Sequence, residues 1–407
     1  MSNLTKKSYF PWLCWFTVAV IYVIQYGLLV TPESLVDELK KSFNISMTQI
    51  GVYSSMFLYA WILMQIPAGI MFDRYNSCKL MFISTLVLAL ACVIQSITNN
   101  YGVALFSRLL MGAAGAFSFV GAVYLARAWF PVTMLAVIIG ITEAVSGLSE
   151  VGFPVMFANL SSHMSWRVII FFIGMVTLVF AFLTLFFVRD IPQESHGKPK
   201  RSTWVDLKTV FADKYLWGLG LYVGFAVAYY FSMADMWGVV WLRRQFDLTT
   251  PQAVYLNSSV ILGFMVGCPV VGWLARYMAR RYLILICMSI EYVMLYFINY
   301  AMPTVLGHSI SLVVLGFFTG GIVLAFDMAK ELVRERHYGL AVGFLNAFFG
   351  LIGVILTPII GYVLMLNTGG VVYKPLTMQL TGAIATIISI FIACLYKFDQ
   401  KKQTEKN

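Results

Sequence analysis

Three ionisable side chains lie inside long apolar runs, where a bilayer or a protein core would surround them. Arg108 lies in the run at 102–126, and Glu143 and Glu150 lie in the next run, at 133–158. A charge in hydrocarbon is costly, so such residues usually bind a substrate, a coupling ion or one another. A guanidinium can hold a carboxylate through two parallel hydrogen bonds, and a buried carboxyl can accept and release a proton.

The spacing of these residues indicates how deep each one lies. At 1.5 Å per residue, Arg108 is roughly 9 Å from the end of its helix, and Glu143 is near the middle of the next one. Glu150 lies on the same face as Glu143, about 10 Å along the helix, and successive spans run in opposite directions. We therefore expect Arg108 to pair with Glu143 or Glu150 when no substrate is bound, and the glutamates to carry a coupled proton. The alternative is a structural ion pair between the two helices.

Other polar and aromatic side chains inside apolar runs are candidates to line a cavity. These are Tyr22, Gln25, Tyr26, Tyr229, Tyr230, Asp235 and Asn346. The first three share one helical face through their i, i+3 and i+4 spacing, and tyrosine rings can pack against a small amphipathic ligand. The alternatives are hydrogen bonds between helices for the first group and an interfacial aromatic belt around Asp235. For Glu291 we expect a structural contact with the run at 252–275.

The composition is that of a protein with many membrane spans. Of 407 residues, 60% are hydrophobic and 11% are charged, and the mean hydropathy is +0.83, whereas a soluble domain is about a quarter charged. The net charge of +10 is attributed to basic cytoplasmic loops rather than to a nucleic-acid surface. Six scattered cysteines without a CxxC spacing predict neither disulfides nor a metal site, and four histidines without a ligand pair disfavour a membrane enzyme. We expect no cofactor.

Apolar runs of span length divide the chain into two similar halves. Six runs lie in residues 1–188, a basic connector occupies 189–214, and six more runs lie in 215–407. The runs are 11–31, 47–71, 79–98, 102–126, 133–158 and 167–188, then 215–241, 252–275, 281–301, 308–329, 339–365 and 376–397. Each is long enough to cross a bilayer as a helix, which predicts an all-α membrane protein with twelve transmembrane helices in a 6+6 arrangement.

The distribution of basic residues predicts that both termini are cytoplasmic. With that orientation, the Lys and Arg residues of external segments are limited to Lys40, Lys41, Arg243, Arg244 and Lys374. Arg108 and Arg167 fall within or at the edge of spans, and the remaining basic residues are cytoplasmic, as the positive-inside rule requires.

A charged junction follows the second span and recurs in part after the eighth. The first reads Gly69-Ile70-Met71-Phe72-Asp73-Arg74 with Lys79 beyond it, and the second reads Gly272-Trp273-Leu274-Ala275-Arg276 and ends at Arg280-Arg281. Matching junctions in two halves are typical of a transporter built from a parallel repeat. We expect Gly69, Asp73, Arg74 and Lys79 to gate the cytoplasmic side from the first half only, because the second junction lacks the acid.

These residues resemble the signature motifs of the major facilitator superfamily. The first junction is similar to its GxxxDRxGxRR loop, with Asn76 and Cys78 as departures, and Arg108 to Gly112 is similar to its RxxxG motif. Ser165-Trp166-Arg167 resembles its WR pair. The resemblance implies two pseudo-symmetric bundles, alternating access and a proton or substrate role for Arg108. The fifth span lacks the Gly-Pro pair of many drug antiporters, which favours uptake.

Within that superfamily, three stretches resemble the proteobacterial phagosomal nutrient transporters, namely 59–67, 112–121 and 128–131. The resemblance implies multi-pass insertion in a bacterial inner membrane and import of a small amphipathic nutrient. An amino acid is the first choice of substrate, with a proton or a sodium ion as the coupling ion. Nucleoside or dipeptide uptake and siderophore or drug export remain alternatives. We expect a monomer in the lipid bilayer, without a nucleic-acid partner.

Overall fold

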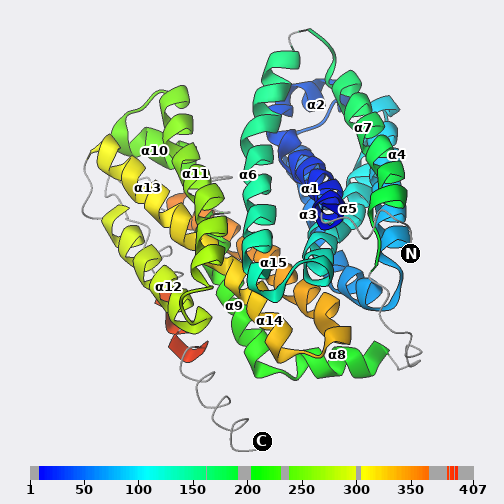
Figure 1. Ribbon diagram of the computed structural model, residues 1–407. Helices are drawn as coiled ribbons and strands as arrows, with labels where there is room; N and C mark the ends of the chain where they lie inside the picture. Colours follow the sequence, from blue (N-terminus) through cyan, green and yellow to red (C-terminus); the bar gives the residue numbers. More distant parts are fainter. Residues whose placement is uncertain are drawn as a thin grey trace, which may run out of the picture. The chain divides into compact units, whose positions relative to one another are not determined.

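The computed structural model describes residues 9–161, 163–190, 203–230, 238–298 and 304–365, with three short pieces at 383–384, 386–388 and 390–392. All regular secondary structure in these residues is helical (Figure 1). This is the expected result for long apolar segments, because a helix satisfies its own backbone hydrogen bonds where water is absent.

The first six predicted spans are all present as helices. Each begins and ends within about one turn of the predicted run. Their bounds, with those of two short elements between them, are α1 Phe10–Ser34, α2 Val36–Phe43, α3 Met47–Arg74, α4 Ser77–Ile97, α5 Tyr101–Trp129, η1 Val132–Met134, α6 Leu135–Leu160 and α7 Trp166–Phe187.

The second half contains more breaks than the sequence predicts. Its elements are α8 Thr203–Phe211, α9 Lys214–Tyr229, α10 Gly238–Phe246, α11 Thr250–Leu274, α12 Arg280–Tyr296, α13 Val305–Thr319, η4 Gly320–Ile322, α14 Val323–Leu332, η5 Glu335–His337 and α15 Tyr338–Met365. The predicted seventh span, 215–241, extends past the end of α9 into residues outside the described ranges. The tenth is divided by the 3-10 turn η4, and most of the twelfth, 376–397, lies outside the described residues.

Polar side chains at the loops define where the helices begin. Ser46 and Gln49 form a capping box at the start of α3, in which the Gln49 amide N–H donates to Ser46 Oγ at 3.3 Å and the Ser46 amide donates to Gln49 Oε1 at 2.9 Å. Asn76 caps α4 and Asn100 caps α5 in the same manner, each accepting from an amide three residues later. Such caps satisfy amide groups that the first helical turn leaves without a partner.

Nine helices of the described residues are long and apolar enough to cross a bilayer. Two further helices, α9 and α12, have 16 and 17 residues and are slightly shorter than the usual length of a span. The chain is therefore a helical protein with many candidate spans.

Contacts within the chain group its residues into two compact units. The first consists of Met1–Val132, Val145–Leu207 and Glu335–Phe344, and the second of Thr133–Ala144, Lys208–Arg334 and Leu345–Asn407. The first turns of α6 thus belong to the second unit, and the first turns of α15 belong to the first. The boundaries predicted at 188 and 214 remain a prediction.

Within each unit, neighbouring helices pack along most of their length. In the first unit α4 packs along α7, and α5 packs against α1, α3 and α4. In the second unit α11 lies beside α13, and α12 also packs on α13 (Figure 1). These pairs place the polar residues described below in helix–helix contacts.

Candidate functional site

Arg108 is buried at the meeting point of three helices in the first unit. The residue is 2% exposed, and its Nη1 donates to the Leu28 carbonyl near the end of α1 at 2.7 Å, with Nη2 3.4 Å from the Leu29 carbonyl. Two rings of α3 cover the guanidinium, with centroids 5.2 Å away for Tyr53 and 4.8 Å for Phe57. The Leu28 carbonyl lacks its usual helical donor because residue 32 is a proline, and the aromatic faces also favour a cation.

The expected pairing of Arg108 with a glutamate differs from what the structure shows. Its guanidinium hydrogen bonds go to carbonyls of α1 rather than to Glu150, although Glu150 is also buried. Two carbonyls inside α1 lie close enough to accept these bonds, and the depth estimate could not reveal this. Glu143, 1% exposed, belongs to the second unit.

The predicted polar stripe of α1 faces α5. Gln25 is fully buried, and its Oε1 accepts from the Ser118 hydroxyl at 3.1 Å. The Tyr22 ring packs edge-on against Tyr26 at 5.9 Å and against Phe119 at 5.5 Å. The stripe therefore makes helix–helix contacts in this structure.

Two buried donors on this surface have no hydrogen-bond acceptor among the described residues. They are Arg108 Nε and Gln25 Nε2. A buried donor without an acceptor costs about 1–3 kcal/mol. The arrangement is therefore chemically suited to a ligand that brings acceptor oxygens.

Asp73, at the first junction, binds the start of α15. Its carboxylate oxygens accept from the Gly339 amide at 2.7 Å and the Leu340 amide at 2.8 Å. A negative charge at a helix N-terminus is stabilised by the unpaired amides and by the helix dipole. A Cβ on Gly69 would overlap the Gly339 carbonyl, so the glycine allows the close approach that this bond requires.

Arg74 binds the connector helix α8. Its Nη2 is 2.6 Å from Asp206 Oδ2, and Nε2 of His337 is 3.1 Å from Asp206 Oδ1. Burial would raise the pKa of Asp206, but the hydrogen bonds from Arg74 and His337 outweigh it and hold the pKa below its usual range. Lys79 follows in the first turn of α4 with its side chain exposed.

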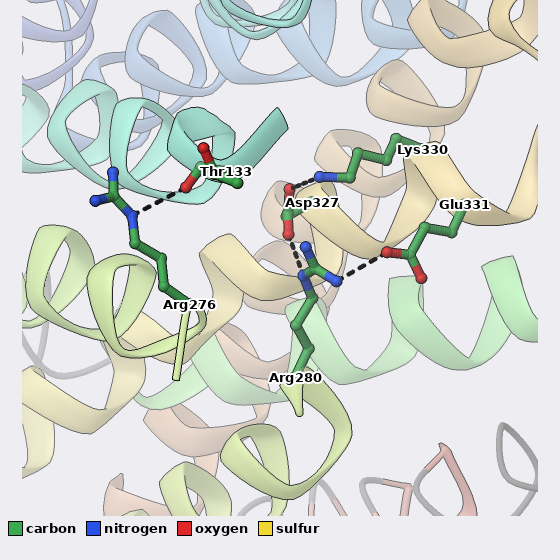
Figure 2. A network of polar contacts seen from close by, with 6 residues as sticks. All are labelled: Thr133, Arg276, Arg280, Asp327, Lys330 and Glu331. Atoms are coloured by element: carbon green, nitrogen blue, oxygen red, sulfur yellow. Dashed lines mark hydrogen bonds and ion pairs between the residues drawn. The ribbon is translucent and has the colours of Figure 1, made fainter. Parts of the chain in front are cut away.

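The second junction makes a similar contact, which we did not expect. Arg276 Nε donates to the Thr133 carbonyl at 3.0 Å, just before α6 (Figure 2). A Cβ on Gly272 would overlap the Ala136 carbonyl, as one on Gly69 would overlap Gly339. The acid is replaced by a base because the second junction binds a carbonyl rather than amides.

An ion-pair network adjoins the second junction. Figure 2 shows Arg280 between Asp327 and Glu331, with its Nη1 2.8 Å from Glu331 Oε1 and its Nε bonded to Asp327. Lys330 Nζ lies 2.6 Å from the other oxygen of Asp327. Because the Asp327 side chain is only 1% exposed, two cations share one buried carboxylate.

The remaining predicted site residues lie in the second unit. Tyr230 is buried and packs on the Phe264 ring at 5.0 Å, and Asn346 of α15 is buried. Tyr229 is the last residue of α9, and Asp235 lies outside the described residues.

Three further polar residues at or within predicted spans are buried. Glu291 is 4% exposed, and its expected contact with the run at 252–275 stays a prediction. His308 and His337 lie at the ends of predicted spans and are 1% and 3% exposed. His308 packs on Phe246 at 4.9 Å, which a span-by-span reading of the sequence does not indicate.

Sequence reasoning missed Asp206, Arg127 and Ser118. Asp206 lies in α8 (Thr203–Phe211), a short helix of the connector. The spacing of apolar residues over these nine positions could have predicted this helix. Arg127 stacks on Tyr338 at 4.4 Å and lies 3.7 Å from Glu335. Its partners follow it by about two hundred residues, so no local pattern points to them.

Comparison with known proteins identifies the family. The model of the Major Facilitator Superfamily matches residues 14–326. The crystal structure of a superfamily transporter, FucP, in the outward conformation matches with a TM-score of 0.73 at 14% identity, over 92% of this chain and 98% of that one. At this identity the match concerns the fold alone, which implies twelve spans.

Curated relatives carry the names of sugar-acid transporters. The probable galactarate/D-glucarate transporter GudP of Escherichia coli is 25% identical over 397 residues, covering 86% of each chain. The D-galactonate transporter of Escherichia coli is 23% identical over 381 residues, covering 85% of this chain and 86% of the relative. The hexuronate transporter of Bacillus subtilis is 23% identical over 364 residues, covering 84% of each chain.

These relatives do not support the narrower resemblance to phagosomal nutrient transporters or the amino acid as first choice. The three stretches behind that resemblance cover a small part of the first half, whereas the curated relatives match most of the chain. The fold and the family model agree on a membrane transporter rather than an enzyme, and the chain belongs to the Major Facilitator Superfamily.

Proposed function

We propose that this chain is a secondary transporter for a small organic acid of the sugar-acid class. The relatives named for galactarate, glucarate, galactonate and hexuronate support this substrate class. Such molecules combine one or two carboxylates with several hydroxyl groups. They therefore need cationic and hydrogen-bonding partners in an otherwise apolar site.

The observation that carries this proposal is the pair of buried donors Arg108 Nε and Gln25 Nε2, which have no acceptor among the described residues. A substrate carboxylate would supply acceptors to the guanidinium, and a substrate hydroxyl would supply one to the amide. Binding would thus remove an energetic cost that the empty protein carries. Tyr22, Tyr26, Tyr229, Tyr230, Asp235 and Asn346 complete the proposed binding set.

The direction and coupling of transport form part of the proposal. We propose import by symport with a proton. The distribution of basic residues supports cytoplasmic termini, and the bacterial relatives support a bacterial inner membrane. Glu143 and Glu150 are the proposed proton carriers. Gly69, Asp73, Arg74 and Lys79 form the proposed cytoplasmic gate, where the bonds of Asp73 to α15 would have to break when the gate opens.

Counterflow with purified protein in proteoliposomes tests the substrate class. The compounds to be compared are glucarate, galactonate, glucuronate, an amino acid mixture and a nucleoside. In each experiment, vesicles are loaded with one of these in unlabelled form, and the same compound is added outside in labelled form. We expect accumulation of a labelled sugar acid and none of the others. Exchange of an amino acid or a nucleoside without any sugar acid would refute the proposal.

The same vesicles test the coupling residues. We expect Glu143→Gln or Glu150→Gln to abolish uptake driven by a pH gradient and to spare exchange, because a neutral amide cannot release a proton. Gradient-driven uptake that survives in both variants would remove the proton role of these glutamates.

A further inference from the structure

A groove runs beside the first turns of α9 in the second unit, and none of its lining residues belongs to the proposed substrate site. Its volume is about 500 Å³, which is the size of a small-molecule site. Its two walls come from α9 and from the twelfth predicted span, which adjoin where a Cβ on Gly218 would lie 3.4 Å from Ile392 Cγ1. The lining residues include Lys214, Trp217, Gly218, Leu221, Ile387 and Phe391. We call this feature the α9 groove.

The α9 groove is apolar along most of its length. Apart from Lys214, it is lined by aliphatic and aromatic side chains and by a glycine. The polar atom of Trp217, Nε1, already donates to the Phe211 carbonyl at 2.8 Å. Hydroxyl and carboxylate groups of a sugar acid would lose their hydrogen bonds here, so the groove suits a hydrocarbon chain instead.

The groove is open to the surface of the second unit. Trp217 is 39% exposed and Phe391 is 52% exposed. Both belong to predicted membrane spans, the seventh at 215–241 and the twelfth at 376–397, and the outer surface of a span faces lipid. An acyl chain of a phospholipid can therefore enter the groove from the side.

A cation lies at one end of this apolar surface. Lys214 is the first residue of α9, and its side chain is exposed. Among the described residues, its Nζ contacts the Tyr215 ring, 5.0 Å from the centroid, rather than a carboxylate. The neighbouring acid, Asp213, accepts from the Tyr215 and Leu216 amides at 2.8 and 3.2 Å. Because Asp213 caps the helix in this way, the charge of Lys214 is available to an anion.

A second cation precedes the groove by one helical turn. The Ala212 amide donates to the Lys208 carbonyl at 3.0 Å, and Ala212 lines the groove. Residues four apart share a helical face, so Lys208, which is exposed, is on the same side as the groove. Both lysines lie near the end of the connector at 189–214, on the predicted cytoplasmic side, where the headgroups of anionic lipids attract basic residues.

We propose that the α9 groove binds one anionic phospholipid. The phosphate of its headgroup lies beside Lys214 and Lys208, and one acyl chain follows α9 past Trp217 to Leu221. A zwitterionic lipid offers the same chain but gains less from the two cations. The bound lipid fills the space between α9 and the twelfth span.

Titration of the purified full-length protein with phosphatidylglycerol and phosphatidylcholine, followed by native mass spectrometry, tests the headgroup contact. We expect tighter binding of phosphatidylglycerol, and Lys214→Gln should weaken it roughly fivefold, since one lysine near a headgroup contributes about that factor. Lys79→Gln is the matched control, because Lys79 is also exposed and predicted to be cytoplasmic, and it should bind as the wild type does. Equal affinity for the two lipids, or an unchanged affinity in Lys214→Gln, overturns the proposal.

Tryptophan quenching tests the position of the acyl chain. Bromine atoms on the chain quench an indole that they contact, so brominated phosphatidylglycerol should quench the wild type more than brominated phosphatidylcholine does. Trp217→Phe should remove this difference. Trp12→Phe should retain it, although Trp12 is similarly exposed at 43%. A difference that survives in Trp217→Phe places the lipid elsewhere and refutes the site.

Inorganic phosphate provides the remaining comparison. Added in excess, it should leave the quenching by brominated phosphatidylglycerol in place, because it has no chain to occupy the groove. Full displacement by phosphate would assign the cations to a free anion and contradict the proposal. None of these measurements uses transport, so their outcome is independent of the proposed substrate class.

Discussion

Among the described residues, the guanidinium of Arg108 hydrogen-bonds backbone carbonyls rather than a carboxylate. Two carbonyls of α1 and the faces of Tyr53 and Phe57 take the place of an anion. Partial charges of this kind stabilise a guanidinium less than a full negative charge does. These groups therefore stabilise the charge of Arg108 in part, and a substrate carboxylate would stabilise it further. Sequence reasoning found Arg108 because a charge in an apolar run is visible, but it could not find two backbone carbonyls as its partners.

Replacing Arg108 by lysine should weaken binding of an acidic substrate. A lysine keeps the charge but cannot reproduce the planar fork that binds a carboxylate through two bonds. We expect the KM for a sugar acid to rise about 10-fold to 100-fold, corresponding to about 1.4–2.8 kcal/mol, with a smaller change in the maximal rate. Initial rates of uptake into proteoliposomes over a range of substrate concentrations measure the effect.

Arg167→Lys is the matched control for this experiment. Arg167 also binds backbone carbonyls, those of Ser96 and Thr98, but it lies at a helix start. Its replacement should leave the KM unchanged. Equal KM values for the wild type and Arg108→Lys would exclude a direct role of Arg108 in binding.

Two helix starts are each held by a junction in the other half of the sequence. Asp73 binds the start of α15, and Arg276 binds Thr133 in the turn η1 that precedes α6. The glycines Gly69 and Gly272 allow both contacts. The sequence showed the repeated glycine, but it did not reveal the contact that Arg276 makes at the second junction.

A larger side chain at Gly69 should separate α3 from the start of α15. Gly69→Leu forces its Cβ into the Gly339 carbonyl, and overpacking of this kind costs about 1–3 kcal/mol. We expect a lower Tm and loss of transport. Gly51 is on the same helix with nothing within 4 Å of an added Cβ, so Gly51→Leu should retain both. Thermal unfolding in detergent and an uptake assay distinguish the two variants.

The contact between Arg74 and Asp206 should weaken in acid. Because the folded-state pKa of Asp206 is below its usual range, its contribution to stability is present above the unfolded-state pKa of about 3.9 and disappears as the pH falls through the folded-state value. At neutral pH it is fully present. We expect Asp206→Asn to lower the Tm at pH 7 and to make no difference at the lowest pH at which the protein stays folded.

The whole chain divides into parts that the sequence predicts well and parts that it does not. The first six spans were located to within about a turn because their apolar runs end at polar capping residues such as Ser46 and Asn100. The tenth span was predicted as one regular helix, whereas it contains the 3-10 turn η4 at Gly320–Ile322. Apolar content gives no signal at such a break. The pairing of α15 with α3 was hidden for a different reason, since it joins residues more than 260 positions apart.

The orientation of the molecule can be tested with two exposed lysines. Lys40 is predicted to be external and Lys79 cytoplasmic, and both side chains are exposed. In a variant without the native cysteines, Lys40→Cys should react with a membrane-impermeant maleimide applied to intact cells, and Lys79→Cys should react only after the cells are opened. The reverse pattern would show that the termini are external.

The bonds from Asp73 to Gly339 and Leu340 also have a consequence for biosynthesis. Asp73 and Gly339 are 266 residues apart, so a ribosome adding about 5–20 residues per second needs on the order of 10–50 s to make the second partner after the first. During that interval α3 is complete, but its carboxylate lacks the helix end that it binds in the finished protein. The first half of the chain therefore leaves the ribosome as an incomplete folding unit, and a transporter truncated before residue 335 would remain one.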